Sequence, residues 1–217
     1  MKKIYLILLS LLLTTNLVLS QKKLNKLKSE IVNSVENHSE NLINISDQIW
    51  GLAETAFNEH KSSKILSDYA EENGFTVEKG VAGMPTAFVA TYGQGKPVIG
   101  VLGEFDALPG LSQKTEPVKS PVTEGFSGHG CGHNMFGAGS LGAAIAIKEM
   151  IEQGKISGTV KFFGTPAEEK FFGKIWMVEA GLWNDVDVNI SWHPSASTEA
   201  DVQTSLALID FKVEFFG

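Results

Sequence analysis

Apolar and polar residues follow two different periods along the chain. Between residues 23 and 69 apolar side chains recur at helical spacing, which predicts two or three helices before any strand. Three extended runs follow, at residues 75–78, 87–92 and 98–102, and their β-branched and aromatic residues predict strands. The third run is apolar throughout, so we expect it at the buried centre of a sheet.

The second half of the chain alternates between helical and extended patterns. Residues 133–152 are rich in Ala, Leu, Ile and Gly and are followed by Gly154, which predicts a buried helix with a glycine cap. A strand at 159–164, a short helix at 175–180 and a strand at 186–192 complete the order. This alternation predicts an α/β fold, a three-layer domain in which helices flank a central, mostly parallel sheet.

The two ends of the chain have patterns of their own. Residues 1–20 combine a short basic region with an apolar run and end on small Ser20, which predicts a cleavable signal peptide and a secreted or periplasmic protein. A membrane anchor is the alternative, but the apolar run is shorter than the roughly 20 residues of a spanning helix, so we expect no stable membrane span. Residues 21–200 would form the main domain. Residues 201–217 end on an alternating strand without a partner, which indicates the start of a truncated domain.

Charge and cysteine content narrow the possible functions. The chain carries 25 Asp and Glu against 18 Lys and Arg, a formal net charge of −7, and shows no basic patch of the kind that binds nucleic acids. Cys131 is the single cysteine, so it cannot form an internal disulfide. Two interpretations of Cys131 stay open, a small buried hydrophobic residue or a thiolate bound to a metal ion.

Four short segments carry the residues that could do chemistry, and each follows a predicted strand or begins a predicted helix. They lie at residues 103–110, 128–134, 164–169 and 191–194. In an open α/β sheet the carboxyl ends of the strands form the ligand crevice, so we expect these segments to meet there. Their thiol, imidazole and carboxylate groups are the ligands that Zn²⁺ accepts.

Each of these residues also has an ordinary structural interpretation. His129 or His193 could be a hydrogen-bonded loop histidine, and Glu168 with Glu169 could be the solvated start of a helix. Five potential ligands or bases at strand ends, in a chain with five histidines and one cysteine, favour a metal centre over coincidence. The run at 137–142 matches the dinucleotide fingerprint and raises a nicotinamide-dependent oxidoreductase as an alternative. No predicted strand precedes that run, so small residues that pack a helix explain it better.

Taken together, the segments resemble the M20 metallopeptidases and amidohydrolases. Within them the chain is most similar to the branch of p-aminobenzoyl-glutamate, auxin-conjugate and N-acyl amino acid hydrolases, and to the first of these above all. Four motifs in family order carry the resemblance, which spans roughly residues 49–217: Glu-Phe-Asp-Ala-Leu-Pro-Gly at 104–110, His-Gly-Cys-Gly-His-Asn at 129–134, Pro-Ala-Glu-Glu at 166–169 and Trp-His-Pro at 192–194. It implies metal-dependent hydrolysis of the amide bond in an N-acyl or aminobenzoyl amino acid or a small peptide.

The resemblance also implies a role for each site residue. Glu168 would be the general base that activates water. Asp106 would either take part directly or support a metal ligand. Two divalent ions, Zn²⁺ or Mn²⁺, would complete the site. The implied metal ligands are Cys131, His133, Glu169 and His193.

The chain departs from the wider superfamily in two ways. Glu104 stands where many dinuclear members have a histidine ligand. The family also supplies a further histidine after an α+β lid and dimerisation domain, of which residues 201–217 would form only the first strand. A homodimer, or a complex with a homologous subunit, would form through that lid. Two functions therefore stay open: the amidohydrolase, or a catalytically inactive fragment or metal-binding module.

Overall fold

A computed structural model describes residues 21–200 and 213–216 of the chain. After the helical residues 21–37 come α2 (Ser39–Leu52), α3 (His60–Glu72), β1 (Thr76–Lys79), η1 (Val81–Gly83), β2 (Phe88–Gln94), β3 (Val98–Glu104), α4 (His133–Glu152), β4 (Gly158–Thr165), α5 (Glu168–Phe171), α6 (Gly173–Glu179) and β5 (Val188–Ile190). The expected signal peptide at residues 1–20 and most of the expected final strand lie outside the described residues. Residues 213–216 belong to no helix or strand.

Five strands form one sheet in the order β1-β2-β4-β3-β5. β3 runs parallel to β4 and β5, whereas β2 runs antiparallel to β1 and β4. The predicted α/β fold, with helices around a central sheet, is confirmed. The sheet has both parallel and antiparallel pairs, whereas a mostly parallel sheet was expected. Helices connect the three parallel strands along the chain, α4 between β3 and β4 and α5 with α6 between β4 and β5. The short link between β1 and β2 is too short for such a crossover, so these strands pair as an antiparallel hairpin.

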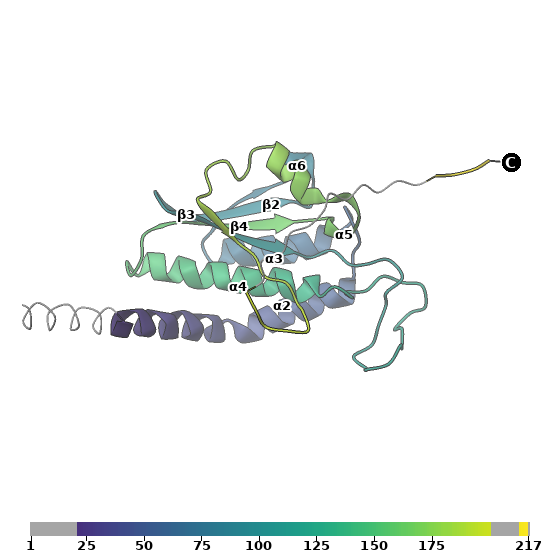
Figure 1. Ribbon diagram of the computed structural model, residues 1–217, viewed down its shortest axis with the longest axis horizontal. Helices are drawn as coiled ribbons and strands as arrows, with labels where there is room; N and C mark the ends of the chain where they lie inside the picture. The colour runs from purple at the N-terminus through teal and green to yellow at the C-terminus, as the bar shows by residue number, and fades with distance from the viewer. Residues whose placement is uncertain (1–20, 201–212, 217) are drawn as a thin grey trace, which may run out of the picture.

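Helices cover both faces of the sheet (Figure 1). α2, α3 and α4 lie on one side, and α6 lies on the other. α4 approaches the sheet closely because Gly137 has no side chain: an added Cβ there would lie 2.7 Å from the carbonyl oxygen of Glu104. The glycine run at 137–142 therefore lies inside a packed helix, as the sequence indicated.

Aromatic side chains fill the core between the sheet and α4. Phe88 on β2 and Phe162 on β4 are fully buried, and their ring centroids lie 5.6 Å apart. Phe105, just beyond β3, is also fully buried and packs its ring against Phe88. This packing fixes the carboxyl ends of β3 and β4, from which the candidate site residues follow. Within the described residues no helix combines the length and apolar character needed to cross a membrane.

Candidate metal centre

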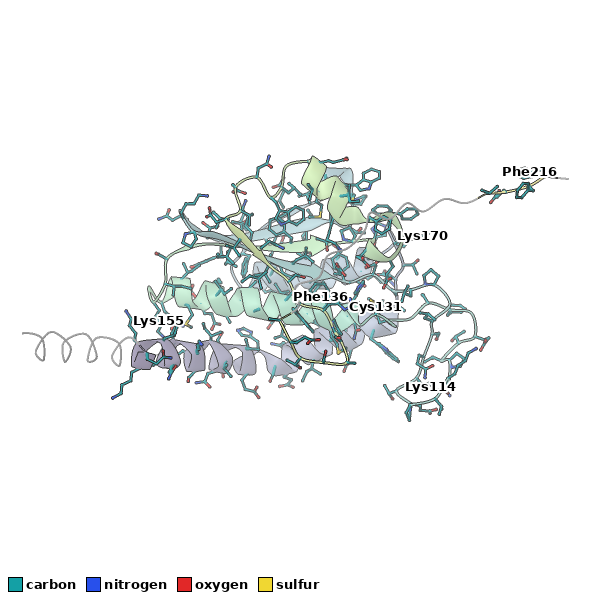
Figure 2. All side chains as sticks on the ribbon, in the orientation of Figure 1. Lys114, Cys131, Phe136, Lys155, Lys170 and Phe216 are labelled. Atoms are coloured by element: carbon teal, nitrogen blue, oxygen red, sulfur yellow. The ribbon has the colours of Figure 1, made fainter. Side chains whose placement is uncertain are left out.

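The three parallel strands bring the candidate residues to one edge of the sheet. Glu104 ends β3 and Asp106 follows it, Glu168 comes three residues after β4, and His193 follows β5. The amino end of α4 and the short helix α5 lie at this same edge (Figure 1). Figure 2 shows Cys131 beside that end of α4. The expectation that the four segments meet at the carboxyl ends of the strands is therefore fulfilled.

His133 is the most enclosed residue of the site. It begins α4, its side chain is fully buried, and its Nδ1 lies 2.9 Å from Asp106 Oδ1. An Nδ1–H that donates to Asp106 leaves Nε2 with a free lone pair. In the neutral ring that lone pair is available to a metal ion, and in the charged ring an Nε2–H faces Glu104 Oε2, 2.8 Å away. Burial alone would lower the pKa of His133, but the carboxylates of Asp106 and Glu104 raise it to about 10.

Cys131 and His193 face each other beside His133. The Sγ of Cys131 lies 3.3 Å from Nε2 of His193, whose Nδ1 lies 2.9 Å from the carbonyl oxygen of Pro194. One donor atom from each of Cys131, His133 and His193 can be chosen so that all three lie within 4.8 Å of one another. Burial and then the nearby Glu169 raise the pKa of the Cys131 thiol to about 12.

A backbone turn and a hydrogen bond position Cys131 and His193. Gly132 takes a φ of 81°, a left-handed conformation that suits glycine, and so turns the chain sharply between Cys131 and His133. Trp192 donates from its ring nitrogen to Ser140 Oγ on α4, at 3.0 Å. The segment after β5 is thereby tied to α4.

The paired glutamates complete the cluster. Glu168 is one-third exposed, and its Oε2 lies 4.0 Å from His133 Nε2. Glu169 is 12% exposed, its Oε1 lies 3.8 Å from His133 Nδ1, and within the described part of the chain that oxygen is buried without a hydrogen-bond partner. Burial raises the pKa of Glu169. Glu104, His133 and Glu168 form a second group of donor atoms within 4.8 Å.

These residues fit a divalent metal ion. Buried polar atoms in folded proteins normally have partners, yet Glu169 Oε1 is buried without a hydrogen-bond partner among the described residues and lies 3.8 Å from His133 Nδ1. A thiol, two imidazoles and carboxylates are the donor set of zinc and related ions. Asp106 is fully buried and also accepts the backbone N–H of Glu169 at 2.9 Å. It therefore orients two candidate ligands, which suits the supporting role of the two considered for it.

Two further residues of this region had no signal in the sequence. Lys174 on α6 pairs with Glu104, and Glu59, ahead of α3, is a fully buried carboxylate. Burial raises the pKa of Glu59 to about 7. His129 belongs to the motif, but its Nε2 lies 3.0 Å from the carbonyl oxygen of Ile49, and burial lowers its pKa to about 4. His129 thus remains neutral and supports the loop.

Comparison with known proteins identifies the family. The model of peptidase family M20/M25/M40 matches residues 100–214, more than half of the chain, and the match includes all four motifs. The chain belongs to this family. The resemblance inferred from the motifs is therefore confirmed.

Individual M20 relatives cover most of the chain. A subunit of the p-aminobenzoyl-glutamate hydrolase of Escherichia coli is 44% identical over 188 residues, 86% of this chain and 39% of that protein. The Xaa-Arg dipeptidase of Mus musculus is 30% identical over 210 residues, 91% of this chain and 45% of that protein. The crystal structure of the Bacillus subtilis YxeP protein, described as a dinuclear metal-binding M20 peptidase, superposes with a TM-score of 0.61 at 28% identity, over 71% of this chain and 42% of that one. The chain thus spans less than half the length of these relatives.

Proposed function

We propose that this chain supplies the metal-binding half of an amidohydrolase that cleaves the amide bond of an N-acyl or aminobenzoyl amino acid or a small peptide. One observation carries the proposal: Cys131, His133 and His193 bring a thiol and two imidazoles within 4.8 Å of one another, beside the glutamate pair. The relatives at 44% and 30% identity are named as hydrolases of such bonds. This favours a hydrolase over an inactive metal-binding module.

The donor atoms suit two ions of Zn²⁺ or Mn²⁺. Cys131 and His193 form one donor group with His133, and Glu104 and Glu168 form a second group with the same histidine. We infer that Cys131, His133, Glu169 and His193 are the ligands that this chain provides. The dinuclear description of the YxeP structure supports a second ion.

Glu168 is the group best placed to move a proton. A bound divalent ion would lower the pKa of water and polarise an amide carbonyl. The Glu168 carboxylate is one-third exposed and near the donor cluster, so it can accept a proton from water and then deliver it to the leaving amine. Asp106 has no exposed side-chain surface and touches His133 and Glu169, so it keeps those side chains oriented during the reaction.

A cavity beside Glu169 offers room for the acyl part of the substrate. Its volume is about 270 Å³, and its apolar wall is formed by Ala56, Ala107, Pro109 and Phe171. An aromatic or aliphatic acyl group fits such a wall, because pockets for small molecules are mostly apolar with a few polar groups. The E. coli relative is named for an aminobenzoyl substrate, which agrees with a cavity of this kind.

Two further expectations concern the whole protein. Its partner would be a second copy or a homologous subunit, and the E. coli relative is itself named as one subunit of a hydrolase, which supports a partner. Export to the periplasm or the medium rests on the signal-peptide pattern of residues 1–20.

Metal analysis with two variants of the full-length natural protein tests the proposal. The native protein should bind Zn²⁺ or Mn²⁺ and release p-aminobenzoate from p-aminobenzoyl-glutamate, or the amine from a related N-acyl amino acid. Cys131→Ser should reduce metal content. Glu168→Gln should abolish turnover and keep the metal, since the amide cannot accept the proton. A native protein that binds no metal, or a Glu168→Gln variant that loses it, would contradict these assignments.

A further inference from the structure

Glu59 lies outside every motif of the family resemblance, yet it is buried directly behind the glutamate pair. Glu59 directly precedes α3 and has no exposed surface. Its Oε1 accepts the backbone N–H of Ala167 at 2.9 Å, and its Oε2 accepts the hydroxyl of Thr86 at 3.2 Å. A fully buried carboxylate destabilises a fold unless hydrogen bonds satisfy it. The role of Glu59 is therefore to be sought in these two hydrogen bonds.

The left-handed backbone conformation of Ala167 has to be held in place by neighbouring groups. Ala167 lies between β4 and α5, immediately before Glu168, and takes a φ of 57° and a ψ of 35°. This left-handed region is uncommon for residues other than glycine, and such a residue persists where its surroundings hold it. The carboxyl group of Glu59 supplies a hydrogen-bond acceptor to the one backbone donor of Ala167.

The turn that presents the glutamates is therefore held at two points. Glu59 binds the N–H of Ala167, and Asp106 binds the N–H of Glu169, at 2.9 Å in both cases. Glu168 lies between these two anchors. Without the bond to Glu59, only the hydrogen bond between Glu169 and Asp106 would remain of these two anchors.

We propose that Glu59 is a positioning residue, which sets the direction of the proposed base Glu168 and the proposed ligand Glu169 through the backbone of Ala167. The proposal rests on the proposed metal centre for its functional consequences. It differs from a purely structural role, in which Glu59 would only link α3 to the segment before β2 through Thr86. The two roles use different carboxylate oxygens, so they can be separated by mutation.

The test compares Glu59→Ala with two controls in the full-length natural protein. Glu59→Gln keeps an oxygen for Ala167 and an amide that can donate to Thr86. Thr86→Val removes only the partner of the other oxygen. Competition with a chelating dye measures the affinity for Zn²⁺ and Mn²⁺. Steady-state kinetics with p-aminobenzoyl-glutamate give kcat and KM, and thermal unfolding measures stability.

We expect Glu59→Ala to weaken metal affinity at least tenfold and to lower kcat more than it raises KM. Glu59→Gln should restore affinity to within threefold of the native value. Thr86→Val should lower the melting temperature but keep metal affinity within threefold. If Glu59→Ala does not fold, Glu59→Met fills a similar volume without an acceptor and replaces it. Unchanged affinity in the Ala or Met variant, or an equal loss in Thr86→Val, would overturn the proposal.

Hydrogen exchange separates this proposal from the proposed function. Peptides that cover residues 166–171 should exchange faster in the Ala or Met variant, while peptides within β4 keep the native rate. If the native protein bound no metal, the proposed function would fail, and this exchange pattern would still decide whether Glu59 holds the turn. Equal exchange in native and variant proteins would refute the positioning role.

Discussion

Metal binding should release about two protons from this protein at pH 8. The carboxylates beside His133 outweigh its burial and raise its pKa to about 10, so its imidazole is charged at this pH before metal binds. Burial and the neighbouring glutamates raise the pKa of Cys131 to about 12, so its side chain is a thiol. A metal ion binds the neutral imidazole and the thiolate, and both protons must therefore leave.

The proton count sets how metal affinity depends on pH. Each displaced proton makes the apparent association constant rise about tenfold per pH unit, because the proton competes with the metal below the pKa of the ligand. With two protons, the logarithm of this constant rises by about two per unit between about pH 7 and 9. The slope falls to about one above the His133 pKa of about 10. An unperturbed histidine, with a pKa of about 6.5, would already be neutral at pH 8 and give about one proton in total.

Calorimetric titration with Zn²⁺ or Mn²⁺ in buffers of different ionisation enthalpy measures this number directly. Cys131→Ser should lower the count to about one. Asp106→Asn removes a carboxylate that raises the His133 pKa, so it should lower the count at pH 8 while the thiol still contributes. One proton or fewer from the native protein at pH 8 would refute the reasoning. An unchanged count in Cys131→Ser would exclude the thiol as a ligand.

Three further predictions test other parts of the site and fold. Lys174→Met leaves the Glu104 carboxylate without its ammonium partner and makes the cluster more negative, so dye competition should show Zn²⁺ affinity higher by about tenfold, equivalent to about 1.4 kcal/mol. Phe162→Ala removes a fully buried ring from the core and should lower the free energy of unfolding in urea by about 3–5 kcal/mol. Ala56→Phe should fill the cavity against Phe171 and raise KM for an aminobenzoyl substrate about tenfold more than KM for an N-acetyl one, whereas equal effects would place the acyl group elsewhere.

The sequence predicted best where one local pattern decided the structure. The helix expected at 133–152 coincides with α4, because a continuous run of apolar and small residues ends at a glycine that takes a φ of 67°. The strands expected at 98–102 and 159–164 lie within β3 and β4, because each is also a largely apolar local run. Since the chemical motifs directly follow these strands or begin α4, their convergence at one edge could be predicted as well.

The features that the sequence did not predict depend on contacts between distant segments. The four-residue helix α5 has left-handed residues on both sides, Ala167 and Phe172, and neither residue type favours that conformation. Lys174 and Glu104 lie 70 positions apart in the sequence and meet only in the folded chain. Glu59 has no motif around it, and its burial follows from the position of the turn after β4.

These contacts explain how one small volume accommodates several acidic groups. Glu104, Asp106 and Glu169 are largely buried, and unpaired negative charges there would destabilise the fold. Without a metal ion, the charge of His133 and the ammonium of Lys174 offset part of this negative charge. A divalent ion would replace the proton of His133 and supply the second positive charge that the Cys131 thiolate requires. For His133, the raised pKa and the proposed metal site share one cause, the carboxylates of Asp106 and Glu104, for which a proton and a metal ion would compete.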